Sequence, residues 1–164
     1  MTPHGGSGPH AQRVQDGSDG TYLDNTPADV WTYERWTLAN IPAGAWTIQS
    51  VDAFMRVYAP TSSEFSLEIE LAGTRHTCMT LAPSDLTPTT YTAAVAMDPL
   101  GNPWTSGNLD AALMWAGEAH LSGDTPGRIY EAGLIVTYAI APAGGPVTAR
   151  TTPQLIKHLM RTGG

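Results

Sequence analysis

The sequence has a single cysteine, Cys78, among its 164 residues. A disulfide within the chain is therefore excluded, and so is a zinc site built from several thiolates. His76 lies two residues before Cys78, but a metal site there needs two more ligands from elsewhere in the chain. We therefore expect Cys78 to behave as a small buried apolar residue, and we expect no metal and no cofactor.

Long hydrophobic runs are also lacking. The richest apolar stretch, residues 134–143, is too short to cross a bilayer. The first ten residues are rich in Gly, Pro, Ser and His and lack the apolar centre of a signal peptide. We expect a protein that is made in a cytoplasm and has no membrane partner.

Charged residues are scarce, at 14% of the chain against the usual ~25%. The net charge of −7 is uneven: all acidic residues lie between Asp16 and Glu131, whereas the segment after Gly145 carries Arg150, Lys157 and Arg161. An acidic body repels phosphate backbones, so we expect no nucleic-acid partner. Few charges suit either a protein that functions inside an assembly or a robust Ala- and Thr-rich domain.

The body of the chain has the two-residue periodicity of β-strands. Residues 64–71 show it most clearly, with Phe65, Leu67 and Ile69 alternating with Ser66, Glu68 and Glu70. Further strands are predicted at residues 21–23, 30–38, 47–58, 74–81, 89–97, 114–121 and 128–140. This succession of short strands and turns predicts an antiparallel all-β sandwich or jelly roll over residues 16–141, with one short helix.

The last of these strands is apolar on both faces. One face is expected to carry Tyr130, Ala132, Leu134, Val136, Tyr138 and Ile140. The other carries Ile129, Gly133 and Ile135. The pattern predicts a central strand or a strand that a partner covers.

Two arms flank the predicted sandwich. Residues 1–15 cannot bury enough apolar surface to order alone, so this arm, with Val14 as its apolar anchor, needs something to hold it. Residues 142–164 are expected to form a linker and a C-terminal arm, in which residues 152–161 predict a helix with Thr152 as N-cap and Pro153 in its first turn. Such a short helix must dock on its own body or on a neighbouring subunit. The candidate partner-binding residues are Val14, Leu155, Ile156, Leu159, Met160 and Arg161.

A turn cluster follows the strand at residues 89–97. Pro99 and Pro103 remove backbone donors, so no strand pairing can continue between Asp98 and Trp104. Gly101 suits a tight turn in this cluster, and Trp104 is expected to seal one end of the sandwich. We predict that Ser106 caps a short helix over residues 108–113.

Catalytic patterns are sparse. There is no Gly-x-Ser-x-Gly turn, and we expect no histidine to lie near a candidate serine. Glu68 and Glu70 share a strand face at a spacing that would suit a glycosidase, but their alternation with core residues indicates a solvated face. We therefore predict that the protein is not an enzyme. The aromatic residues that could form a sugar-binding platform are Trp31, Tyr33, Trp46, Tyr58 and Trp115.

Two turn motifs carry a resemblance to a known family. They are Asp16-Gly17-Ser18-Asp19-Gly20-Thr21-Tyr22-Leu23 and Asp98-Pro99-Leu100-Gly101-Asn102-Pro103-Trp104-Thr105. In this order they resemble the Asp-Gly-Asp-x-x-Tyr-Val-like start and the Asp-Pro-x-x-Gly-x-x-Trp-Thr turn of jelly-roll-like β-sandwich proteins found in tailed-bacteriophage particles. The resemblance spans residues 16–141, and Ser18-Asp19 departs slightly from it.

The resemblance implies a structural protein of the virion. We expect a capsid decoration (cement) protein on the head exterior that binds the major capsid protein and forms a homo-oligomer, with a trimer as the natural form. The alternative is an adaptor or attachment module of the tail, collar or fibre that grips a host glycan.

Overall fold

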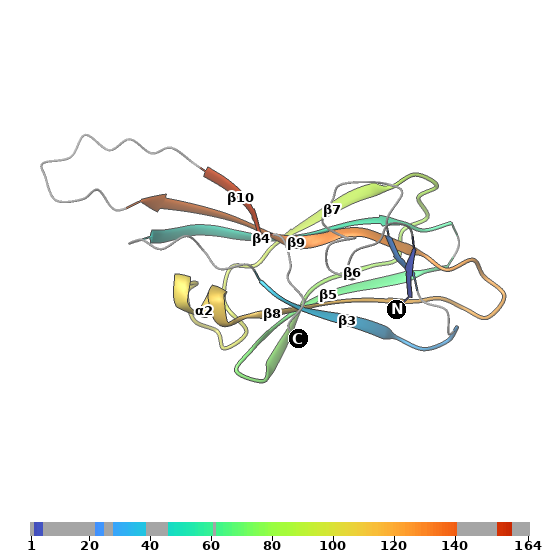
Figure 1. Cartoon of the computed structure of the whole chain (residues 1–164), viewed down its shortest axis with the longest axis horizontal. Helices are drawn as coiled ribbons and strands as arrows, with labels where there is room; N and C mark the ends of the chain where they lie inside the picture. The colour runs from blue at the N-terminus through green and yellow to red at the C-terminus, as the bar shows by residue number, and fades with distance from the viewer. Residues whose placement is uncertain are drawn as a thin grey trace, which may run out of the picture.

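The computed structural model describes residues 2–4, 22–24, 28–38, 46–60, 62–140 and 154–158. Two antiparallel sheets face each other, with the short helix α2 at one end (Figure 1). One sheet has the order β1-β2-β9-β4-β7, with β10 also paired to β9, and the other has the order β3-β8-β5-β6. The predicted all-β sandwich with one short helix in its body is confirmed.

The first sheet contains the longest strands. Its members are β1 (Thr2–His4), β2 (Tyr22–Asp24), β4 (Trp46–Tyr58), β7 (Thr89–Ala94), β9 (Arg128–Ile140) and β10 (Gln154–His158). The second sheet and the helix comprise β3 (Thr32–Thr37), β5 (Glu64–Leu71), β6 (Thr74–Leu81), β8 (Leu113–Ala119) and α2 (Ser106–Ala111).

The pairing of β4 with β9 forms the spine of the first sheet. Its register runs from Trp46 opposite Ile140 to Tyr58 opposite Arg128. The remaining edge of β9 is divided between β2 at its start and β10 near its end. β9 is therefore a central strand, as its apolar residues on both faces predicted.

A register shift between Arg56 and Val57 changes which face of β9 meets the core. Ile129 lies opposite Val57 and is fully buried in the core, whereas Tyr130 is buried outside the core cluster beside the Arg56 guanidinium. The strict alternation expected from the sequence was therefore wrong for this pair, because a bulge inverts the side-chain phase. From Ala132 onward the prediction holds for the side chains that the structure describes.

The inner face of the second sheet follows the predicted period. Phe65, Leu67 and Ile69 of β5 are fully buried against Met114 and Ala116 of β8 and the inner face of β4. β5 and β6 have the bounds that were predicted for them. Another bulge, at Cys78, interrupts the pairing of β5 with β6, so that Cys78 and its neighbour Met79 both pack on the core. Cys78 is half-buried, where full burial was expected; burial raises the pKa of its thiol to about 12, so the neutral side chain packs on the core as an apolar group.

The predicted helix at residues 152–161 is wrong where the structure describes it. Gln154–His158 forms strand β10, which pairs antiparallel with β9 from Tyr138 to Leu134 (Figure 1). A helix of about ten residues is marginal by itself, whereas the edge of β9 offers backbone donors and acceptors. The first arm behaves similarly, since Thr2–His4 forms β1 and pairs with β2.

Trp104 closes the end of the sandwich next to α2. Its side chain is buried, and its indole N–H donates a 2.7 Å hydrogen bond to the Val95 carbonyl. This ring therefore performs the sealing role predicted for it.

We predict that Trp104→Ala lowers the free energy of unfolding by about 3–5 kcal/mol, the usual cost of deleting a buried tryptophan. Trp104→Phe should cost only about 1–3 kcal/mol, because it keeps most of the buried ring and leaves the Val95 carbonyl without its donor. Urea denaturation followed by circular dichroism measures both, with Leu86→Ala at an exposed position as the control. Equal losses for the two Trp104 variants would contradict the sealing role.

Candidate functional site

The outer face of the β3-β8-β5-β6 sheet carries a concentration of aromatic and charged side chains. In one row, Arg35 of β3 lies opposite Trp115 of β8, which lies opposite Glu68 of β5. In the next row, Tyr33 lies opposite Gly117. The period of two along each strand places these side chains on the same side of the sheet.

These side chains form a continuous stack of rings and guanidinium groups. The Trp31 and Tyr33 rings stack with centroids 5.7 Å apart and planes at 21°. The Arg75 guanidinium lies 5.1 Å from the Tyr33 centroid and 4.2 Å from the Trp115 centroid, and Arg35 lies 5.3 Å from the same Trp115 ring. We call Trp31, Tyr33, Arg75, Trp115 and Arg35 the aromatic ladder. Each cation–π contact adds to the stability of the arrangement.

The two glutamates of β5 hold the ladder in place. Glu68 forms a 2.7 Å ion pair with Arg75, and Glu70 accepts a 2.8 Å hydrogen bond from the Trp115 indole N–H. Both glutamates are half-buried. The expectation of a freely solvated face was therefore wrong, because the aromatic rings of β3 and β8 cover the neighbouring carboxylates.

Gly117 makes room for the Tyr33 ring. A Cβ atom on Gly117 would lie 2.6 Å from two ring carbons of Tyr33. The ring therefore rests directly on the β8 backbone, which fixes the height of the Trp31–Tyr33 stack above the sheet.

Trp31 ends the ladder beside a hollow of about 330 Å³. Because one face of its ring stacks on Tyr33 and 37% of the residue is exposed, its other face is available to solvent. The hollow is lined by Asp29, Trp31, Ser62, Glu64, Ala119, His120 and Leu121. β8 begins just after α2 and ends at Ala119, so this Trp31 hollow lies at the end of the sandwich opposite α2.

A buried polar cluster supports the wall of the Trp31 hollow. Glu118 is fully buried; its carboxylate accepts a 3.0 Å hydrogen bond from the Gly127 N–H and lies 3.3 Å from His120 Nδ1. Burial raises the pKa of Glu118, although the Gly127 and His120 contacts act in the opposite direction. Ser63 is buried next to Gly127, and its hydroxyl is a further contact that lowers the pKa of Glu118.

This cluster brings a histidine and a serine near one carboxylate, which contradicts the expectation that no histidine lies near a candidate serine. Ser63 lies just before β5, whereas Glu118 and His120 lie at the end of β8. Because these segments are far apart in the sequence, the sequence pattern did not predict the cluster. Ser63 is only 1% exposed, so a substrate carbonyl has no route to its hydroxyl in this arrangement. We interpret the cluster as a structural element that stabilises this end of the sandwich.

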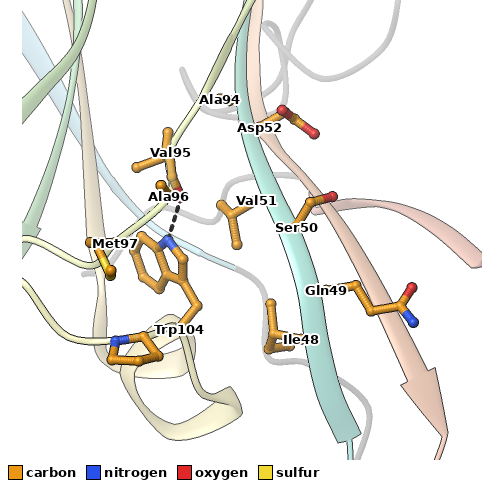
Figure 2. Close-up of a pocket in the computed structure, with 11 residues that line it drawn as sticks. Ile48, Gln49, Ser50, Val51, Asp52, Ala94, Val95, Ala96, Met97 and Trp104 are labelled. Atoms are coloured by element: carbon orange, nitrogen blue, oxygen red, sulfur yellow. Dashed lines mark hydrogen bonds between the residues drawn. The ribbon is translucent and has the colours of Figure 1, made fainter.

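A second concavity, of about 460 Å³, lies at the α2 end between β4 and the chain that leaves β7. Figure 2 shows Ile48 and Val51 of β4 on one side of this groove and Trp104 with Met97 on the other. The Val95 amide donates to the Val51 carbonyl (2.8 Å), and within the described part of the chain no strand pairs with this edge of β4 before Val51. The groove therefore combines an open backbone edge with apolar side chains.

The predicted turn cluster is organised by one carboxylate. Asp98 accepts hydrogen bonds from the Leu100 amide (2.9 Å), the Asn102 amide (2.8 Å) and the Asn108 side chain (2.7 Å). Gly101 has φ of 82°, a conformation that favours glycine. Burial alone would raise the pKa of Asp98, but these hydrogen bonds outweigh it and hold the pKa below its ordinary value.

Asn108 links the turn to the helix. The N-cap of α2 is Thr105, not Ser106 as predicted, and the Thr105 hydroxyl accepts from the Asn108 amide while the Asn108 side chain accepts from the Thr105 amide. The same Asn108 side chain donates to Asp98, which fixes where the helix starts. The helix therefore occupies Ser106–Ala111, shifted from the predicted residues 108–113.

The other predicted site residues are dispersed. Of the partner-binding candidates, Leu155 and Ile156 lie in β10, opposite Thr137 and Val136 of β9. The others, Val14, Leu159, Met160 and Arg161, fall outside the described residues. Among the sugar-platform candidates, Tyr58 lies on β4 next to Arg128 rather than in the ladder. Residues of the Trp31 hollow that sequence reasoning missed are Asp29, Glu64 and His120.

Within the described ranges, no three His, Cys, Asp or Glu side chains gather in a way that could hold a metal ion. No helix among these residues is long and apolar enough to cross a membrane. Comparison with known protein families and with curated protein sequences finds no match to this chain.

We expect Asp98→Asn to lower the melting temperature by several degrees at neutral pH, because an amide cannot accept all three hydrogen bonds as strongly. A carboxyl whose pKa is lowered on folding stabilises the protein above its unfolded pKa, here 3.8, and that stabilisation is lost as the pH falls through the folded pKa. The difference between wild type and variant should therefore shrink below about pH 4. Thermal melts at a series of pH values test this, and a difference that stays constant would contradict it.

A pair of glycine substitutions tests the packing beside Glu118. A Cβ on Gly127 would lie 2.4 Å from Phe65 Cζ and 2.8 Å from Ser63, so Gly127→Ala should cost about 1–3 kcal/mol through overpacking. A Cβ on Gly107 in α2 has no neighbour closer than 4.0 Å, so Gly107→Ala should be neutral or stabilising by up to about 1 kcal/mol. Chemical denaturation compares the two, and the reverse order would refute the close packing at Gly127.

Proposed function

We propose that this protein is a structural component of a tailed-phage particle, most simply a decoration protein on the outside of the head. The observation that carries the proposal is that β2 with its partner β1 and β10 both occupy the same edge of β9. The resemblance of the two turn motifs to those of phage-particle proteins supplies the phage context.

Addition of a strand to a sheet edge is a suitable way to join subunits, because it uses backbone hydrogen bonds that any strand can form. An uncovered edge of β9 would present a row of free donors and acceptors, which proteins normally protect. The chain covers this edge with residues 22–24 at one end, which lie about a hundred residues before β9, and with residues 154–158 at the other, which follow β9 in the chain; β1 extends the sheet by pairing with β2. The same hydrogen bonds form equally well with a strand of a neighbouring subunit, so exchange of β10 between copies would link subunits in a closed ring.

The charge distribution supports contacts between unlike surfaces. The acidic body and the basic segment after Gly145 are complementary, so the C-terminal segment of one copy is attracted to the body of another. A decoration protein of this kind stabilises the head by mass action, because it binds the assembled shell and not its free subunits. The open edge of β4 beside Trp104 offers a further position where a strand of the capsid protein can add.

The second candidate is an adaptor or attachment module of the tail, collar or fibre. The aromatic ladder favours it, because exposed Trp and Tyr rings are typical of recognition surfaces. Copy number in the particle separates the two candidates: hundreds of copies indicate the head, and a few dozen or fewer indicate the tail.

Ile156→Pro tests the role of β10. Proline lacks the backbone N–H and disrupts pairing with Val136 of β9, whereas the control Ile156→Ala keeps the N–H. We expect the proline variant to be depleted from particles at least severalfold and to lose oligomers in light scattering, with the alanine variant close to wild type.

Quantitative mass spectrometry of purified particles and an electron cryomicroscopy map provide the measurements. Absence of the wild-type protein from the particle would end the proposal, and equal incorporation of both Ile156 variants would remove β10 pairing from it.

A further inference from the structure

We propose that the Trp31 hollow is a binding site for a neutral hexopyranose unit of a glycan. The site combines an aromatic ring that is held rigidly, a cavity of about 330 Å³, and carboxylate and imidazole groups at its wall. The inference does not depend on whether the protein decorates the head or the tail.

The Trp31 ring is pre-organised to receive a flat apolar surface. Tyr33 stacks on one face of it, and Tyr33 is in turn held by Gly117 below it and Arg75 beside it. A pyranose presents such a surface where its axial C–H groups point to one side of the ring. Because Trp31 is already fixed, stacking a sugar on its free face costs little side-chain entropy.

The polar groups of the hollow suit hydroxyl donors. The Asp29 carboxylate is fixed in direction, since its backbone N–H donates to the His120 carbonyl (2.7 Å) and its side chain accepts from the Ser122 amide (3.2 Å). Asp29 also has φ of 59°, so this loop is held in an uncommon conformation. Glu64 adds a second carboxylate at the start of β5, and both carry acceptor capacity for sugar hydroxyls.

His120 completes the wall with a restricted ring. It is 5% exposed, and its Nδ1 faces the Glu118 carboxylate, so the ring has a fixed orientation in the wall of the hollow. The Trp31 ring and the polar groups of the wall together suit a neutral sugar ring. Anionic ligands are repelled by Asp29 and Glu64, and a hollow of this size admits one ring rather than a folded peptide surface.

The carboxylates of Asp29 and Glu64 should make the hollow discriminate between neutral and acidic sugars. The probes are methyl glucoside, methyl galactoside, methyl mannoside and N-acetylglucosamine, with sialic acid and glucose 6-phosphate as acidic counterparts. We expect at least one neutral probe to bind with a dissociation constant of about 1 mM, the weak end of specific recognition, and both acidic probes to fail.

Saturation-transfer NMR and tryptophan fluorescence of the full-length protein detect binding. Trp31→Ala should weaken it about tenfold or more, whereas Trp31→Phe keeps an aromatic face and should weaken it less. Asp29→Asn keeps the acceptor for Ser122 and tolerates positive φ, and should weaken binding through loss of the charged acceptor alone. Leu86→Ala, exposed and absent from the lining of the hollow, is the control that should bind as wild type.

The outcomes decide the proposal in either direction. Binding of a neutral probe that is lost in Trp31→Ala, with unchanged circular dichroism and melting temperature, supports the site. Absence of binding by all four neutral probes overturns it, as does neutral-probe binding that Trp31→Ala leaves unchanged or preference for the acidic sugars. None of these results bears on incorporation into particles, so the assembly proposal stands or falls separately.

Discussion

The antiparallel ladder between β4 and β9 is the constraint on which the rest of the structure depends. These two strands supply much of the core from one sheet, with Val51, Ala53 and Met55 opposite Val136, Leu134 and Ala132. A ladder of this length leaves two long outer edges to be satisfied. β7 pairs with part of the β4 edge, and β2 and β10 each pair with part of the β9 edge. The positions of β7, β2 and β10 therefore follow from the length of the β4–β9 ladder.

The two ends of the sandwich are closed by different chemistry. At the α2 end, the Asp98 carboxylate gathers backbone amides, and Trp104 fills the space between the sheets. At the opposite end, a buried carboxylate, Glu118, is satisfied by Gly127 and His120. A buried carboxylate costs free energy unless it accepts hydrogen bonds. At each end, the loop must therefore adopt a conformation that brings its backbone amides to the carboxylate.

The outer faces of the sheets carry the features that can meet a partner. On the four-stranded sheet, the aromatic ladder combines the stacked Trp31 and Tyr33 rings with guanidinium groups packed on Tyr33 and Trp115, and Glu68 and Glu70 tie it to β5. Its rigidity is a property useful for recognition, because fixed aromatic groups lose little entropy on binding. On the six-stranded sheet, β10 pairs with the edge of β9 through its backbone, and the edge of β4 before Val51 has no partner strand among the described residues.

The local elements could be predicted from the amino-acid pattern alone, because they depend on neighbours along the chain. Alternation in residues 64–71 identified β5, and the prolines with Asp98 and Trp104 identified the turn that ends the strand before α2. Tertiary structure decided what depends on distant partners. The bulge at Arg56 and Val57 moved Ile129 into the core. The free edge of β9 made residues 154–158 a strand, although their apolar spacing favoured a helix. The Trp31 hollow likewise unites Asp29, Glu64 and His120 from three segments, and no spacing in the sequence encodes such a meeting.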